Sequence, residues 1–146
     1  MDVTTRLKQL KKLSNIDTVL NQVLKSLEKD ILNLNRDQMY EDGVMDIKNP
    51  SAILHYAPST IKNKKGRARF NRVDHITLKW EGDFHKTLKI KYNEDSMLIY
   101  SEDSKWKAYL QPQDRFQNAL GLTDASLSLL RDWIKDELIN RFRNGK

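Results

Sequence analysis

The stretch that decides the fold is HITLKWEGDFHKTLKIKYNEDSMLIY, residues 75–100. Apolar and polar side chains alternate over residues 75–80 and again over residues 84–92, and a period of two is typical of strands that bury one face. Turn-forming residues follow each run, and residues 97–100 are again apolar or aromatic. Lys86 is the one charged side chain on the expected apolar face. The stretch predicts a three-stranded antiparallel meander.

Helical periodicity appears on both sides of this meander. Over residues 16–34 apolar side chains recur every three or four positions, which places them in one stripe on a long helix. A second stripe follows the capping pair Thr123-Asp124 and consists of Leu127, Leu130, Ile134 and Leu138. The sequence therefore predicts an α+β fold: a long N-terminal amphipathic helix, a long irregular arm, a three-stranded antiparallel meander and a C-terminal helix.

The irregular arm is residues 42–72, where no periodicity is present and turn-forming pairs are frequent. We expect it to protrude from a single domain that spans residues 1–146, a length that supports one hydrophobic core. Six basic residues of this arm lie close together without an acidic residue between them, namely Lys62, Lys64, Lys65, Arg67, Arg69 and Arg72. Without these six, the 26 basic residues of the chain fall to 20, equal to its 20 acidic residues, so the net charge of +6 is a local feature.

Two kinds of partner fit this basic stretch. Its cations can lie along a nucleic-acid backbone, where neutralising phosphates releases counterions and gives salt-sensitive binding. They can also contact the acidic surface of a neighbouring subunit, or remain solvated. Phe70 is the one aromatic residue among them, so stacking on bases has little support. The sequence favours a solvated loop or a protein contact over nucleic acid.

The residue types that carry catalysis or bind metals are sparse. The chain has no cysteine, which excludes disulfides, thiolate metal sites and a cysteine nucleophile. His75 and His85 flank a turn, but two histidines without a third ligand make a poor zinc site. A metal-dependent nuclease can be drawn from Asp103 with Asp83 or Asp95, although such matches arise by chance in a chain with 32% charged residues. We expect no catalytic residue, no metal and no cofactor.

Two aromatic residues are candidates for a contact between subunits. Trp106 and Tyr109 stand among lysines in an irregular connection, and aromatic side chains beside charges are typical of interface hot spots. The alternative is that they pack onto the sheet. No uncharged run approaches the ~18 residues of a membrane span, and residues 1–13 interleave leucine with lysine. We expect a protein that is made in the cytoplasm and has no membrane partner.

Four short segments also carry a resemblance. They are LNRDQMY at residues 34–40, YAPST at residues 56–60, HITLKWEGDF at residues 75–84 and GLT at residues 121–123. In this order they resemble a family of small structural proteins of tailed phages and prophages of Bacteroidetes-type hosts, over about residues 16–140. The chain departs from the family where Trp80-Glu81 replaces Asp-Thr before the turn glycine, and where Gln113 to Gln117 replaces a YG-x-x-I-F segment.

The resemblance implies a role in the virion. Members look like head–tail connector (neck), tail-completion or minor virion proteins, which form rings and have no enzyme activity. It implies a homo-oligomer that binds portal, adaptor or tail-tube proteins, and that is located in the virion after assembly in the host cytoplasm. DNA that passes along the particle axis during packaging is a further partner that the basic arm can face. A nucleic-acid-binding module that uses residues 61–72 is the alternative, and a metal-dependent nuclease is the third hypothesis.

Overall fold

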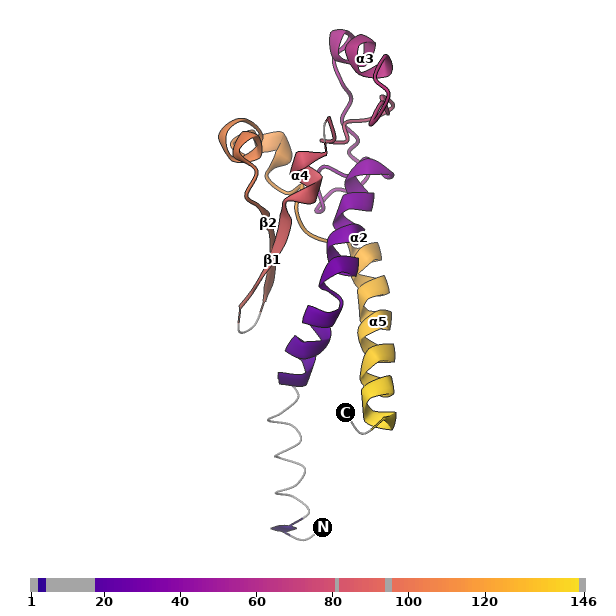
Figure 1. Ribbon diagram of the computed structural model, residues 1–146, viewed down its shortest axis with the longest axis vertical. Coiled ribbons are helices and arrows are strands. Elements are labelled where there is room, and N and C mark those ends of the chain that lie inside the picture. Colours follow the sequence, from indigo (N-terminus) through magenta and orange to yellow (C-terminus); the bar gives the residue numbers. More distant parts are fainter. Residues whose placement is uncertain (1–2, 5–17, 81, 94–95, 145–146) are drawn as a thin grey trace. The chain divides into compact units, whose positions relative to one another are not determined.

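The structure, a computed structural model, is drawn in Figure 1. It describes residues 3–4, 18–80, 82–93 and 96–144. The chain separates into two compact units. We call residues 30–127 the hairpin unit, and residues 1–29 with 128–146 the terminal unit. No helix among the described residues is long and apolar enough to cross a membrane.

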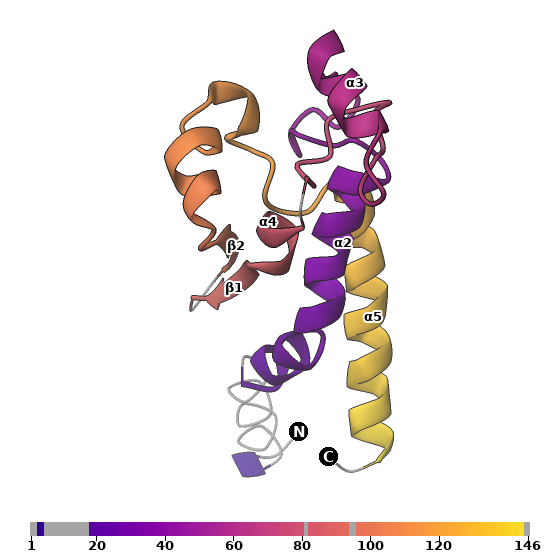
Figure 2. The ribbon, with the colours of Figure 1, turned by 45° about the horizontal axis from the view of Figure 1, so that its top comes forward.

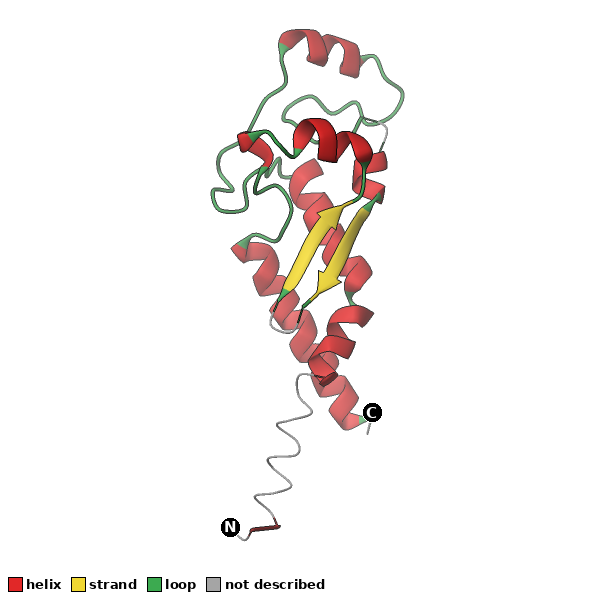
Figure 3. Cartoon of the chain, turned by 90° about the vertical axis from the view of Figure 1, so that its left-hand side faces the viewer, coloured by secondary structure: helices red, strands yellow, loops and turns green. Residues whose placement is uncertain are grey.

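The sheet of the hairpin unit is an antiparallel pair of strands (Figure 3). Strand β1 is Leu88–Tyr92 and β2 is Met97–Ser101, with Ile90 opposite Ile99. Alternate side chains of the pair are buried, among them Ile90 and Ile99, as expected for strands with one face on a core. The hairpin is therefore a local structure, because its two strands are neighbours in the sequence and pair with each other.

The predicted three-stranded meander is wrong, because residues 75–80 form no strand. Within the described residues this sheet has two strands, and the helix α4, Asp83–Lys86, directly precedes β1 (Figure 2). Leu78 has a φ of 55°, in the left-handed region that a strand cannot contain. Ile76 and its neighbour Thr77 are both buried, so the alternation of apolar and polar residues does not correspond to two faces.

Side chains from other segments replace the missing strand partners of residues 75–80. The Thr77 amide donates to Tyr56 Oη at 2.9 Å, and the Thr77 carbonyl accepts from His85 Nε2 at 2.8 Å. The Lys79 carbonyl accepts a 2.6 Å hydrogen bond from Lys64 Nζ. Because buried backbone groups need partners, these bonds substitute for a sheet ladder. We call residues 75–80 the tethered segment.

The predicted long helix over residues 16–34 is also wrong. Residues 18–26 are helical, residue 27 is a turn, and α2 then runs over Glu28–Tyr40, while residues 16 and 17 lie outside the described part. At the break the Leu27 amide donates to both Val23 O at 3.1 Å and Leu24 O at 3.2 Å. A shared amide of this kind is common at helix ends, and it marks the interruption of an otherwise continuous apolar stripe.

The expected irregular arm contains a helix. Helix α3 is Pro58–Lys65, and proline at its start is favoured because the first helical position needs no amide hydrogen. Before it, Val44 and Ile53 form an isolated antiparallel bridge. The prediction that residues 42–72 form an irregular arm is therefore wrong in part, because this segment contains a helix and a bridge and belongs to the hairpin unit. Whether the chain forms a single assembly domain stays a prediction.

Side-chain amides of α2 hold the segment that leads into the last helix. Asn35 Nδ2 donates to Ala119 O at 3.2 Å, and its Oδ1 accepts from the Gly121 amide at 2.9 Å. One turn further on, Gln38 donates to Gly121 O at 3.0 Å and accepts from the Thr123 amide at 3.0 Å. Asn35 and Gln38 are buried and share one face of α2, since their spacing is three residues. We call these four hydrogen bonds the amide clamp.

The remaining elements follow β2. The π-helix η1 is Trp106–Leu110 and the 3₁₀ helix η2 is Asp114–Phe116. The C-terminal helix α5 is Asp124–Arg143, and Thr123 caps it because Thr123 Oγ1 accepts from the Ser126 amide at 3.2 Å. Trp106 and Phe116 are both buried, so η1 and η2 contribute to the core of the hairpin unit.

Candidate functional site

The six cations of the basic stretch do not share one surface. Lys64 is fully buried, with 0% of its surface exposed. Its ammonium donates to Lys79 O at 2.6 Å and lies over the rings of Tyr56 and Trp80, at 5.5 and 5.4 Å from their centroids. Burial, together with the charge of Arg67, lowers the pKa of Lys64 to about 8. Lys64 therefore fixes the tethered segment and is not available to a partner.

Two arginines of the stretch are also engaged within the hairpin unit. Arg72 forms ion pairs with Glu41 at 2.8 Å and Asp74 at 2.9 Å. The Arg67 guanidinium lies 4.3 Å over the Trp80 ring and donates to Trp80 O at 2.9 Å. The charge of Arg72 is thus balanced locally, whereas Lys62, Lys65 and Arg69 are exposed.

The burial of Lys64 gives a direct chemical prediction. An amine-acylating reagent should modify Lys64 at least about tenfold more slowly than Lys62 and Lys65, because a local opening that costs about 1.4 kcal/mol reduces the rate by that factor. Peptide mass spectrometry over a labelling time course measures the three rates on one helix of one sample. Equal rates at the three lysines would mean that Lys64 is exposed and that the tethered segment is held in another way.

Another group of cations lines a pocket of about 450 Å³ in the hairpin unit, which we call the cationic pocket. It is lined by Arg36, Arg69, Phe70, Lys79, Gly82, His85 and Lys86. Only Arg69 belongs to the predicted basic stretch. Arg36 comes from α2, and Lys79 and Lys86 come from the tethered segment and from α4, more than 40 residues further along the chain, so folding brings these cations together. None of the described residues that line the pocket is acidic.

Arg36 is fixed in this pocket by neutral groups. Its Nε donates to His85 O at 2.6 Å, and its Nη1 donates to Asn33 Oδ1 at 2.9 Å. These bonds use two of the five N–H hydrogens of the guanidinium. Burial lowers the pKa of Arg36 from its ordinary value, while the nearby charge of Asp37 acts in the opposite direction. These two hydrogen bonds therefore orient the guanidinium, and neither of them pairs its charge with a carboxylate.

An aromatic ring organises two further cations. The guanidinium of Arg69 lies 4.8 Å from the centroid of the Phe70 ring, and Lys79 Nζ lies 4.6 Å from it. Phe70 has a φ of 53°, an unusual value for a bulky residue, and such strain is typically retained at functional positions. Gly82, with a φ of 91°, lies so close that an added Cβ would come within 3.3 Å of this ring. The ring is thus held in place by the turn that opens α4.

His85 is the buried titratable group of the pocket. Its Nε2 bonds Thr77 O, and because a carbonyl only accepts, Nε2 carries the hydrogen. Its Nδ1 is buried and has no hydrogen-bond partner among the described residues, and the side chain is 2% exposed. The pKa of His85 is lowered to about 4, mainly by burial and also by the charges of Lys79, Arg36 and Lys64, although the hydrogen bond to Thr77 acts in the opposite direction. His85 is neutral at pH 7 in this pocket.

The other groups proposed for metal chemistry serve the fold or lie apart. His75 is buried and its Nε2 contacts Tyr40 O at 2.7 Å. Asp83 and Asp103 do line one small pocket, of about 240 Å³, but Asp103 Oδ2 accepts from the Trp106 amide at 2.9 Å. In the part of the chain that the structure describes, no group of three histidines or carboxylates is placed to hold a metal ion. Asp95 lies outside that part.

The two aromatic interface candidates have different environments. Trp106 is 3% exposed and its ring stacks on that of Phe84 with 4.5 Å between centroids, so it packs inside the hairpin unit. Tyr109 is 72% exposed on the same π-helix. A subunit contact through these residues stays a prediction, and of the two Tyr109 is the accessible side chain.

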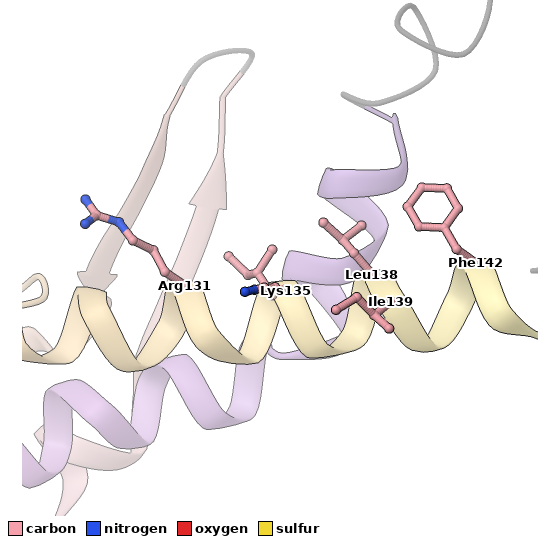
Figure 4. Close-up of a pocket in the computed structure, with 6 residues that line it drawn as sticks. Arg131, Lys135, Leu138, Ile139 and Phe142 are labelled. Atoms are coloured by element: carbon pink, nitrogen blue, oxygen red, sulfur yellow. The ribbon is translucent and has the colours of Figure 1, made fainter. Parts of the chain in front are cut away.

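An apolar groove runs along the second half of α5, in the terminal unit (Figure 4). It encloses about 400 Å³ and is lined by Arg131, Ile134, Lys135, Leu138, Ile139 and Phe142. Ile139 is 40% exposed and Phe142 is 72% exposed. We call it the α5 groove. Its aliphatic and aromatic floor with two cations at one end is the composition of a protein-contact surface rather than of a polar reaction site.

Comparison of the chain with protein-family models, with curated proteins and with solved structures finds no match.

Proposed function

We propose that this chain is a structural protein of a tailed-phage particle that acts by self-association. The observation that carries the proposal is the α5 groove, where Ile139 and Phe142 leave apolar surface exposed at the end of a long helix. Exposed contiguous apolar surface is costly in water, and in soluble proteins it commonly marks a site of protein contact. A second copy of the chain would cover it.

The resemblance to phage structural proteins supports the same role. Its segments 34–40 and 121–123 are the two sides of the amide clamp, in which Asn35 and Gln38 bond residues 119–123. Two of the segments that carry the resemblance therefore serve the framework of the hairpin unit. These residues bind backbone atoms of the same chain. We propose that the function resides on the surfaces of the protein, as in a scaffold without enzyme activity.

The role that we propose is ring-type oligomerisation in head–tail connection or tail completion, with portal, adaptor or tail-tube proteins as neighbours. Contacts in a ring are heterologous, so the groove of one subunit would meet a different surface of the next; a two-fold dimer would pair two grooves. The proposed location is the virion, after assembly in the host cytoplasm.

Oligomeric state is the test of this proposal. The wild-type chain should give a defined oligomer by light scattering after size exclusion, and the double variant Ile139→Ser with Phe142→Ser should shift it to the monomer. Truncating hot-spot residues of this kind typically costs about 2 kcal/mol or more, which weakens association by roughly thirtyfold or more. Both positions are exposed, so the fold should persist, and circular dichroism checks this.

Leu98→Ser is the matched control. Leu98 is an exposed apolar residue on β2, far from α5 in the sequence, and its loss should leave the oligomer unchanged. A wild-type chain that stays monomeric at high concentration and does not copurify with portal or tail proteins would contradict the proposal. Dissociation by Leu98→Ser alone would move the interface to the hairpin.

A further inference from the structure

We propose that the cationic pocket binds a phosphate group, and that the phosphodiester backbone of a nucleic acid is the source it fits. The site differs from the basic stretch of the sequence, because three of its four cations, Arg36, Lys79 and Lys86, lie outside that stretch. It also lies in a different unit from the α5 groove. The proposal is therefore independent of self-association.

The charge of the pocket is the first argument. Four cations converge on about 450 Å³, and none of the described lining residues is acidic. Like charges that line one pocket repel each other, and the binding of an anion offsets this repulsion. Arg72 shows the contrast, because the same chain pairs that arginine with Glu41 and Asp74. In the pocket, Arg36 instead donates to an amide oxygen, Asn33 Oδ1, and to a backbone carbonyl, His85 O.

Preorganisation is the second argument. Arg36 is oriented by two hydrogen bonds, which leave the rest of its planar fork for a ligand, and a guanidinium fork matches two oxygens of a phosphate. Lys79 and Arg69 are held against the ring of Phe70, whose backbone adopts a strained positive φ. A site whose donors are already positioned loses less conformational freedom when it binds.

The third argument is the unpartnered nitrogen of His85. This side chain is 2% exposed, lines the pocket, and has a buried Nδ1 without a hydrogen-bond partner. Buried polar atoms are nearly always paired, so an unpaired one indicates a missing ligand or water. With a phosphate oxygen nearby, the ring would take up a proton at Nδ1 and donate it, while Nε2 keeps its bond to Thr77. The charged groups that face His85 are Lys79, Arg36 and Lys64, all cations, and an anion offsets their effect.

A nucleic-acid backbone fits better than a small free anion because further cations are exposed in the same unit. Lys62 and Lys65 lie on α3, and the bond from Lys64 to Lys79 ties this helix to the tethered segment that supplies the pocket. A polyanion can occupy the pocket with one phosphate and reach α3 with its neighbours, which a single phosphate ion cannot do.

Two charge-matched double variants test the site. Arg69→Gln with Lys86→Gln removes two exposed cations of the pocket, and Lys62→Gln with Lys65→Gln removes two exposed cations of α3. Calorimetry with inorganic phosphate, and fluorescence anisotropy with a short oligonucleotide at several salt concentrations, measure binding. The pocket variant should lower the affinity for both phosphate and the oligonucleotide by at least about tenfold, as expected for lost charged hydrogen bonds. The α3 variant should spare phosphate and lower the oligonucleotide salt slope by about one per lost contact.

The outcomes separate the possible sources. Equal losses from the two variants would overturn a defined pocket in favour of diffuse charge. Phosphate binding without oligonucleotide binding would overturn the nucleic-acid source, and tight binding of polyglutamate without phosphate binding would identify an acidic protein surface instead. In the wild-type chain, nitrogen NMR of the His85 ring near pH 6 should show Nδ1 gaining a proton when phosphate is added. An unchanged ring in the presence of bound phosphate would remove His85 from the site.

Discussion

Asn35→Leu is expected to lower the free energy of unfolding by about 4 kcal/mol, because it leaves one buried and one partly buried backbone group without partners at about 1–3 kcal/mol each. Asn35 bonds both Ala119 O and the Gly121 amide, and it is completely buried, so water cannot replace it. Leucine has a similar volume, and the loss would come from hydrogen bonding more than from a cavity. Urea unfolding followed by circular dichroism measures the change.

The control for this prediction lies on the same helix. Asn33 is exposed, and Asn33→Leu removes a hydrogen bond to Arg36 without burying an unpaired group, so the change should stay within about 0.5 kcal/mol. If Asn35→Leu cost no more than Asn33→Leu, the amide clamp would not be what holds residues 119–123. Gln38→Leu should repeat the large loss, since Gln38 bonds Gly121 O and the Thr123 amide.

Local sequence patterns predicted the parts of the fold that are themselves local. Strand β1 occupies the second half of the alternating run at residues 84–92, and β2 covers the apolar run at residues 97–100, because a hairpin pairs neighbouring segments. The first expected strand fails because Tyr56, Lys64 and His85 satisfy the backbone of residues 75–80, and no pattern within those six residues reports on side chains from elsewhere. The break at residue 27 likewise left the apolar spacing of the N-terminal stripe intact.

The candidate sites show the same limit. A run of lysines and arginines is visible in the sequence, but which of them are buried is decided by tertiary contacts, as Lys64 and Arg72 illustrate. The cationic pocket draws Arg36 and Lys86 from separate helices, so composition could not group them. One signal did exist: Lys86 breaks the apolar face expected for residues 84–92, and a charged residue that violates a pattern is often functional. The exposed apolar side chains of α5, Ile139 and Phe142, lie beside the stripe that the sequence indicates and not in it, so the stripe alone did not identify the α5 groove.

Acidification should destabilise the hairpin unit between pH 6.5 and pH 4 through His85. The pKa of this histidine is lowered from 6.5 to about 4 in the folded chain, by burial first and by nearby cations in addition. The histidine of the unfolded chain therefore binds a proton near pH 6.5, whereas that of the folded chain binds it only near pH 4. The stabilisation is complete above pH 6.5 and is lost as the pH falls toward 4, and this difference in pKa corresponds to about 3 kcal/mol.

Unfolding free energies at a series of pH values measure this loss, and His85→Gln isolates its source. Glutamine can still donate to Thr77 O but does not titrate, so its stability should change much less between pH 6.5 and pH 4. His55→Gln, at an exposed histidine, should keep the wild-type slope. Asp74 and Glu102, whose pKa values are lowered by hydrogen bonds to Arg72 and Lys89, add a further loss at lower pH in every variant. A wild-type curve that is flat from pH 6.5 to pH 4 would show that His85 protonates freely in the folded chain, and hence that its ring is not enclosed among cations.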